Sequence, residues 1–259
     1  MGWGLIVISV VVAWAASFLN FLLYPASSSF LNDGGGEGAH TRKNVLLVIA
    51  HPDDESMFFT PTINYLVSRG HNLHVLCLSI GNFDGLGNVR RDELYRACAM
   101  LKVPPDQVKI LDHPDLQDGF GLAWDHDLLA KIIEDEASRS SIEMVISFDD
   151  YGVSGHCNHR DVHFGIRKLL HAVSPGRGIE AWELVSTSIF RKYSGPMDIW
   201  LSKFLSGISV NGLTYCLLNE HPRKSFLAMA EHSSQWVWFR KLFVSFSSYT
   251  YVNTLKRIT

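Results

Sequence analysis

From residue 44 onward, short apolar runs alternate with segments of helical periodicity, and this alternation constrains the fold more than any other feature of the chain. The apolar runs are dense in β-branched residues, as expected of strands that are buried on both faces. They fall at residues 45–50, 73–80, 108–111 and 144–148, and the helical segments fall at 89–101, 125–137 and about 158–172. This order predicts an α/β domain with a Rossmann-like, mostly parallel sheet and helices on both faces.

Histidine and acidic residues gather after three of the predicted strands. The carboxyl ends of parallel strands meet at one edge of a sheet, where ligands bind. We therefore expect these loops to converge on one catalytic site. The three clusters are His51-Pro52-Asp53-Asp54-Glu55, Asp112-His113-Pro114-Asp115, and Asp149-Asp150-Tyr151 leading to His156-Cys157-Asn158-His159.

The first and last clusters contain the residue types of a catalytic metal site. A catalytic zinc takes three ligands from His, Asp and Glu and keeps a fourth position for water. The adjacent Asp53 and Asp54 point in different directions on a turn, so one could bind metal while the other faces the water. The spacing of His156, His159 and His163 puts them along one helical face or its leading turn. A carboxylate beside a metal-bound water would act as a general base.

Each cluster also has a purely structural interpretation. His-Pro-Asp segments often cap helices, because Asp caps a helix and Pro begins one. His163 is equally compatible with a surface or supporting position, Cys157 with a packed thiol, and residues 112–115 with a capped turn. The chain contains no Gly-x-Ser-x-Gly, Walker or Gly-x-Gly-x-x-Gly segment, so nothing in it favours a serine hydrolase or a nucleotide-binding protein.

The segment from Gly4 to Tyr24 is uncharged and long enough to cross a bilayer as a helix, which takes about 20 residues. A cleaved signal peptide is the alternative, but no basic residue precedes the apolar run. We predict a transmembrane anchor at 1–24, a flexible Ser- and Gly-rich tether at 25–43 and the catalytic domain at 44–259. Arg42 and Lys43 follow the span, which places the domain in the cytosol.

Composition narrows the partners and the compartment. The net charge of −3 provides no broad positive field, so we expect no nucleic acid to bind. The four cysteines show no CxxC spacing, and Cys77 and Cys98 fall within predicted strand and helix, which favours buried reduced thiols. The apolar segment 197–218 fits either an interfacial segment or a core helix, and 225–243 is predicted to be one helix.

Taken together, the motifs resemble the zinc-dependent N-acetylglucosaminyl de-N-acetylases, over nearly everything from Asn44 onward. The resemblance rests on residues 50–55 and 155–163, with support from Arg90-x-x-Glu93-Leu94 and His232-Ser233-Ser234-Gln235. Residues 79–82, 151–156 and 238–240 resemble in particular the members that act on N-acetylglucosaminyl-phosphatidylinositol, in the second step of glycosylphosphatidylinositol anchor synthesis. The resemblance implies a glycolipid substrate and a single-pass protein of the endoplasmic reticulum membrane.

The resemblance also implies a role for individual residues. His51, Asp54 and His159 would bind Zn²⁺ or another divalent metal, and Asp53 would be the general base. His156 would stabilise the oxyanion and Arg90 would bind substrate. Many bacterial relatives have Asp in place of Asn158, and a neutral amide holds a neighbouring imidazole less strongly in its charged form, so the protonation state of His156 stays open. Supporting roles fall to Asn158, His163, His232 and Gln235.

Two other functions are compatible with the same residues. A de-N-acetylase of a soluble sugar conjugate would keep the chemistry and change the substrate. A non-catalytic membrane scaffold would keep the fold alone, but Asp53 and Asp54 would then have no use.

Overall fold

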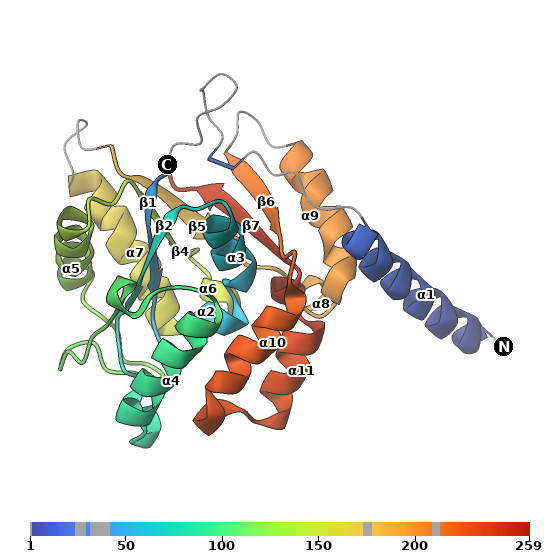
Figure 1. The fold of residues 1–259 in the computed structure, drawn as a ribbon, viewed down its shortest axis with the longest axis horizontal. Helices are drawn as coiled ribbons and strands as arrows, with labels where there is room; N and C mark the ends of the chain where they lie inside the picture. Colours follow the sequence, from blue (N-terminus) through green and yellow to red (C-terminus); the bar gives the residue numbers. More distant parts are fainter. Residues whose placement is uncertain (1, 24–29, 32–41, 173–177, 209–212) are drawn as a thin grey trace.

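The domain is built around a seven-stranded sheet with the strand order β3-β2-β1-β4-β5-β7-β6 (Figure 1). The structure is a computed structural model, and it describes residues 2–23, 30–31, 42–172, 178–208 and 213–259. The strands are β1 (Asn44–Ile49), β2 (Asn72–Cys77), β3 (Val108–Ile110), β4 (Met144–Phe148), β5 (Glu180–Leu184), β6 (Thr214–Leu218) and β7 (Val252–Arg257).

The direction of the strands divides the sheet into two parts. From β3 to β5, neighbouring strands pair in parallel, whereas β7 is antiparallel to both β5 and β6. The chain moves outward from β1 through β2 to β3 and then returns to β4 on the other side of β1. Such a reversal leaves a crevice at the carboxyl ends of β1 and β4, which is where ligands bind in open α/β sheets.

Helices cover both faces of the sheet. α5 and α7 pack together on one face, and α3, α4 and α10 lie on the other. The helices are α1 (Gly2–Leu23), α2 (Asp54–Met57), α3 (Thr60–Ser68), α4 (Gly87–Met100), α5 (His126–Arg139), α6 (Gly152–Gly155), α7 (Cys157–Ala172), α8 (Ile189–Lys192), α9 (Asp198–Gly207), α10 (Pro222–Glu231) and α11 (Trp238–Phe246). Short 3₁₀ turns are η1 (Asn82–Asp84), η2 (Pro105–Gln107), η3 (Gly195–Met197), η5 (Ser233–Gln235) and η6 (Ser248–Thr250).

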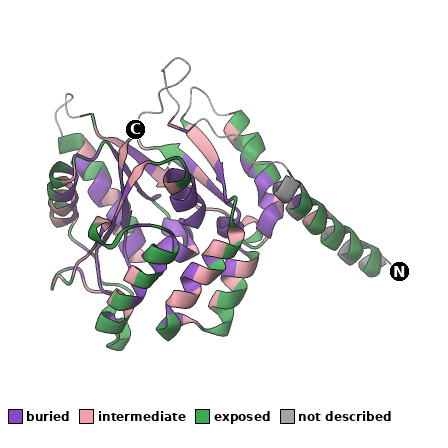
Figure 2. Ribbon diagram, viewed as in Figure 1, coloured by how far each residue is buried: buried purple, intermediate pink, exposed green. Residues whose placement is uncertain are grey.

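The core follows from the strand sequences. Leu46, Leu47, Val48 and Ile49 of β1 are all 0–1% exposed, because the strand has helices on both sides (Figure 2). Full burial of one such side chain contributes roughly 1.5–3 kcal/mol. The predicted mostly parallel α/β sheet with helices is thus confirmed, and the predicted strands and helices before residue 172 occur with ends shifted by up to three residues.

One of the two late segments differs from its prediction. The single helix expected at 225–243 is wrong: α10 ends at Glu231, and the 3₁₀ turn η5 separates it from α11. Serine side chains compete with helical hydrogen bonds, and Ser233 and Ser234 donate to the Glu93 carboxylate at 2.9 and 2.7 Å. The described part of the segment 197–218 contains α9 and β6, and residues 209–212 lie outside it.

The amino-terminal segment forms α1, which contacts η3 and places Trp14 against Phe246. Within the described residues, no helix meets both the length and the hydrophobicity required to cross a bilayer, so the predicted anchor at 1–24 is not confirmed. Most of the segment predicted as a tether, 25–29 and 32–41, lies outside the described residues. Phe30, inside that segment, is 1% exposed and packs edge-on against Trp182.

Candidate active site

The loop after β1 places two neighbouring carboxylates in different environments. One oxygen of Asp54 accepts hydrogen bonds from the backbone N–H groups of Ala50 and His51 at 3.0 and 2.9 Å, and the other faces His159 Nε2 at 3.2 Å. Burial raises the pKa of Asp54, but the nearby His159 and His51 outweigh it and lower the pKa to about 2. Asp54 is therefore a fixed negative charge at the carboxyl end of β1.

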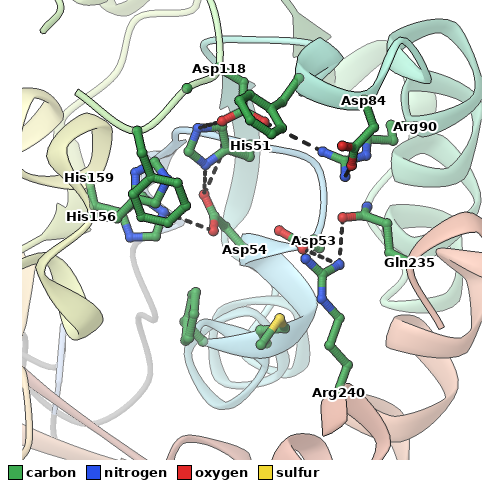
Figure 3. Close-up of a pocket in the computed structure, with 15 residues that line it drawn as sticks. His51, Asp53, Asp54, Asp84, Arg90, Asp118, His156, His159, Gln235 and Arg240 are labelled. Carbon is green, nitrogen blue, oxygen red and sulfur yellow. Dashed lines mark hydrogen bonds and ion pairs between the residues drawn. The ribbon is translucent and has the colours of Figure 1, made fainter. Parts of the chain in front are cut away.

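Asp53 has a strained backbone, with a φ of 130° in a region that favours glycine. Its N–H donates to the carboxylate of Glu55 at 3.1 Å, and its own carboxylate contacts Arg240 at 2.7 Å. Burial raises the pKa of the Asp53 carboxyl, while the guanidinium of Arg240 opposes that change. The turn directs Asp53 away from Asp54, as predicted for two separate roles (Figure 3).

His159 begins the second element of the site, in the first turn of α7. Its ring stacks on Phe148 with centroids 4.0 Å apart, and its Nδ1 donates to the Gly152 carbonyl at 3.0 Å. Gly152 has a φ of +66°, and a Cβ there would lie 2.6 Å from the Cβ of His159, so no larger residue fits. The proton on Nδ1 leaves Nε2 as an acceptor that faces the Asp54 carboxylate.

His51 has the complementary arrangement. Its Nε2 lies 3.1 Å from an oxygen of Asp118 and 3.1 Å from the Asn158 carbonyl oxygen, so Nε2 carries the proton. The Asn158 amide donates to the Leu122 carbonyl at 2.9 Å, which fixes its oxygen toward His51. Nδ1 of His51 is then an acceptor, 3.9 Å from the Asp54 carboxylate. Asn158 therefore hydrogen-bonds to His51, whereas the sequence had led us to expect an effect on His156.

His156 faces the same cluster from the turn between α6 and α7. Its ring centroid lies 4.8 Å from that of His51 and 5.0 Å from that of His159. Nδ1 of His156 is buried and has no hydrogen-bond partner among the described residues. Burial, with the neighbouring His51 and His159, lowers its pKa to about 4. The ring is therefore available to form a hydrogen bond with a group that enters the site.

These residues surround a cavity of about 280 Å³ at the carboxyl ends of β1 and β4 (Figure 3). Arg90 extends into it from α4, and its guanidinium donates to the Gly81 carbonyl at 2.8 Å and pairs with Asp118 at 3.5 Å. The cavity is lined by His51, Asp53, Asp54, Met57, Phe58, Phe83, Asp84, Arg90, Asp118, Gly119, Phe120, His156, His159, Gln235 and Arg240.

The donor set fits a divalent metal. Nε2 of His159 and an oxygen of Asp54 are both acceptors 3.2 Å apart, and a cation held by these residues would relieve their mutual repulsion. Ligand atoms that are 2.0–2.1 Å from a tetrahedral zinc lie about 3.3 Å from each other. One ring nitrogen from each of His51, His156 and His159 also lies within 4.8 Å of the others. The two candidate sets share His51 and His159.

Three residues from the last part of the chain complete the site. Gln235 donates to the Pro52 carbonyl at 2.8 Å and accepts from Arg240 at 2.5 Å. His232 pairs with Glu55 at 2.6 Å, and both side chains are fully buried. The sequence indicated His232 and Gln235 but missed Arg240, although the resemblance included it, and missed Asp118, for which no local signal exists.

Other predicted residues lie outside the cavity. His163 is buried one turn beyond His159, and its Nδ1 lies 3.2 Å from the Phe148 carbonyl and 3.4 Å from Glu183, so it supports α7 from behind. Residues 112–115 lie at the surface: Asp112 faces Arg91 at 3.8 Å, and Asp115 is largely exposed. The Cys157 thiol lies near loop carbonyls, away from the cluster. The loop after β3 thus reaches the site through Asp118 and not through residues 112–115.

A buried set of imidazoles and a carboxylate, with a second carboxylate beside it that faces the cavity, is the arrangement of a metal-dependent hydrolase. Residues 46–170 match the family model PIG-L, GlcNAc-PI de-N-acetylase. The chain is 36% identical to the probable N-acetylglucosaminyl-phosphatidylinositol de-N-acetylase of Dictyostelium discoideum, over 88% of this chain and 98% of that protein. It is also 36% identical to the Bos taurus enzyme, over 85% of this chain and 84% of that one. The chain belongs to this family of de-N-acetylases.

Solved structures agree on the fold. The N,N'-diacetylchitobiose deacetylase of Pyrococcus horikoshii superposes with a TM-score of 0.58 at 15% identity, over 94% of this chain and 92% of that one. A conserved protein of Thermus thermophilus superposes with a TM-score of 0.58 at 14% identity, over 85% and 95% of the two chains. At these identities the likeness concerns the arrangement of the sheet and helices.

Proposed function

We propose that this chain hydrolyses the acetamide of N-acetylglucosaminyl-phosphatidylinositol, giving glucosaminyl-phosphatidylinositol and acetate. One observation carries the proposal: Asp53 faces a cavity beside a buried cluster of His51, Asp54 and His159, in a chain that matches de-N-acetylases along nearly its whole length. A scaffold would have no need for Asp53 in a strained backbone conformation, which costs about 1–3 kcal/mol.

We propose Zn²⁺ as the metal, with His51, Asp54 and His159 as its ligands. The tautomers support this set, since Nδ1 of His51, Nε2 of His159 and the Asp54 carboxylate are all free to accept. When bound, zinc would polarise the acetyl carbonyl and acidify a water molecule. The alternative set, with His156 in place of Asp54, would leave no imidazole free to contact the substrate.

The residues of the chain then have distinct tasks. The Asp53 carboxylate takes a proton from water, and the water oxygen adds to the acetyl carbon. His156, whose lowered pKa leaves it neutral near pH 7, donates a hydrogen bond from a ring N–H and stabilises the negative charge that develops on the carbonyl oxygen. Asp53 returns the proton to the sugar nitrogen as the C–N bond breaks, which releases acetate and the free amine. Arg90 would bind sugar hydroxyls at the opposite wall of the cavity.

We further propose that the protein works at the endoplasmic reticulum membrane with its catalytic domain toward the cytosol. A lipid substrate confines the reaction to a membrane surface, and four free cysteines, two of them buried, suit a reducing compartment. Protease protection of sealed microsomes tests the orientation: the domain should be digested without detergent. Protection of the domain would contradict it.

Acetate release tests the activity itself. The purified chain should release acetate from N-acetylglucosaminyl-phosphatidylinositol, and a chelator should stop the release until zinc is restored. The same sugar linked to inositol phosphate without acyl chains distinguishes a soluble-conjugate enzyme, which would prefer it. A zinc-loaded protein that releases no acetate from either substrate would contradict the proposal.

A further inference from the structure

Helix α11 exposes a row of large apolar side chains. Trp238, Phe239, Leu242 and Phe246 are 72%, 54%, 49% and 48% exposed. The opposite side of the helix is packed, because Val244 is buried. A soluble surface normally keeps such side chains scattered, and a row of this kind marks an interaction site.

The charges on α11 are of one sign. Arg240 and Lys241 are its charged residues, and the helix contains no acidic residue. The ammonium of Lys241 lies 5.3 Å from the ring of Trp236. Arg240 is turned toward Asp53 in the cavity, so Lys241 is the charge that α11 exposes. An exposed lysine beside a row of tryptophan, phenylalanine and leucine is typical of segments that lie in a membrane interface, where anionic lipids attract the basic group.

The exposed row begins at the mouth of the active-site cavity. Arg240, between Phe239 and Lys241, reaches into the cavity to pair with Asp53 (Figure 3). Two further exposed aromatic residues line the same cavity, Phe83 at 65% and Phe120 at 84% exposure. The cavity therefore has exposed aromatic side chains from η1 and from the loop after β3, and α11, with Trp238 and Phe239 next to Arg240, lies beside it.

The row also continues onto α1. Phe246, at the end of α11, contacts Trp14 of α1, and both helices contact η3. On α1, Leu5, Ile8, Val11 and Val12 are 60–66% exposed. Ile189 and Phe190 of α8 are also exposed. Figure 1 places α1, α8 and α11 on the same side of the molecule.

We propose that α11 docks on a lipid bilayer containing anionic lipid, with Trp238 and Phe239 in the interface, and holds the cavity mouth against the membrane. The inference rests on the proposed function, since only a lipid-linked substrate gains from this orientation. Tryptophan favours the headgroup region, and phenylalanine is typical of the apolar face of a helix that lies in the interface. A glycolipid headgroup then enters the cavity while its acyl chains stay in the bilayer. A second copy of the chain is a poorer partner, because two α11 helices would bring their exposed Lys241 ammonium groups together.

The test uses the full chain on vesicles of phosphatidylcholine with and without phosphatidylserine. Backbone amides of α11 should exchange more slowly on the vesicles that contain phosphatidylserine, and the variant Trp238→Ser/Phe239→Ser should lose this protection. The control Met100→Ser/Leu213→Ser changes two apolar side chains that are each 37% exposed elsewhere on the surface, and it should behave like the wild type. This measurement needs no turnover, so it stands even if the proposed activity fails.

Turnover provides the second measurement. The Trp238→Ser/Phe239→Ser variant should lose at least about tenfold in kcat/KM on substrate in vesicles, as expected from two lost apolar contacts. On the same headgroup without acyl chains it should stay within about twofold of the wild type, because these side chains are outside the catalytic site. Equal losses on both substrates, unchanged exchange in α11 on vesicles, or a dimer that dissociates in the variant would each overturn the proposal.

Discussion

The parallel and antiparallel parts of the sheet contribute to the active site in different ways. The parallel part, from β3 to β5, supplies His51, Asp54, His156 and His159 from two loops at the carboxyl ends of β1 and β4, where the strand order reverses. The part after β5 supplies His232, Gln235 and Arg240, which contact the first loop from the other side. One region provides the groups that fit a metal, and the other fixes the position of Asp53.

The difference teaches where precision in this site comes from. Asp54 is held by the backbone of its own loop, through two N–H groups within four residues. Asp53 depends on distant residues, because its N–H binds Glu55, which in turn binds His232, and its carboxylate binds Arg240. Metal binding and base positioning should therefore be separable by mutation.

The largest expected effect divides the two neighbouring carboxylates. Asp53→Asn should lower acetate release by about 10³-fold or more while zinc content stays near one per chain, because the general base is lost and the ligands remain. Asp54→Asn should lose both zinc and activity. Metal analysis beside the acetate assay checks this, with the exposed Asp115→Asn as a neutral control. An active Asp53→Asn enzyme would remove Asp53 from the mechanism.

The next effect concerns the contact between Glu55, in the loop after β1, and His232, in the part of the chain after β5. Glu55→Gln leaves His232 without its charged partner in a fully buried site, and we expect the free energy of unfolding to fall by about 3–5 kcal/mol. Urea unfolding measures this. The double variant Glu55→Gln/His232→Asn should lose less than the sum of the single losses, since the two residues are in contact. Additive losses would show that the pair is not coupled.

A smaller effect distinguishes the orientation of the Asp53 carboxylate from the stability of the fold. Arg240→Gln should lower kcat on the soluble headgroup substrate by about 10- to 100-fold, because a misplacement of about 1 Å can cost that much. Arg240→Lys should recover part of the loss, since it keeps the charge without the planar fork. Lys241→Gln, its neighbour on α11, is the matched control and should match the wild type. An unchanged Arg240→Gln would mean that the late region does not position Asp53.

The smallest effect lies where β5 meets β7. Burial raises the pKa of Glu183 to about 7, with Asp149 and Asp150 adding to the shift and Lys256 opposing it. Because the folded pKa is above the unfolded value of 4.5, the protonated form stabilises the fold below pH 4.5, and this stability is lost as the pH rises through 7.

Glu183→Gln should therefore reduce the fall in unfolding free energy between pH 5 and pH 8 by about 1 kcal/mol, after allowance for solvent screening. Urea titrations at both pH values measure it. The exposed Glu220→Gln should keep the wild-type difference. A Glu183→Gln profile as steep as that of the wild type would show that another group titrates.

The sequence predicted the parallel part of the domain and the motifs at its strand ends, because buried strands and amphipathic helices leave periodic patterns that are local in the chain. It did not predict β5, β6 or β7, nor the break between α10 and α11. That break depends on Glu93, which lies far earlier in the chain and binds Ser233 and Ser234. Asp118 and Arg240 likewise owe their place to tertiary contacts with His51 and Asp53, which leave no periodicity to detect.

The position of β7 has a consequence for the order in which the protein matures. β7 follows every other strand in the chain, yet it lies between β5 and β6 inside the sheet. During synthesis the candidate metal ligands of the loops after β1 and β4 emerge early, whereas β6 can join the sheet only after β7 has been made. The nascent chain could therefore bind a metal before its base is in position, and catalytic competence would arrive last.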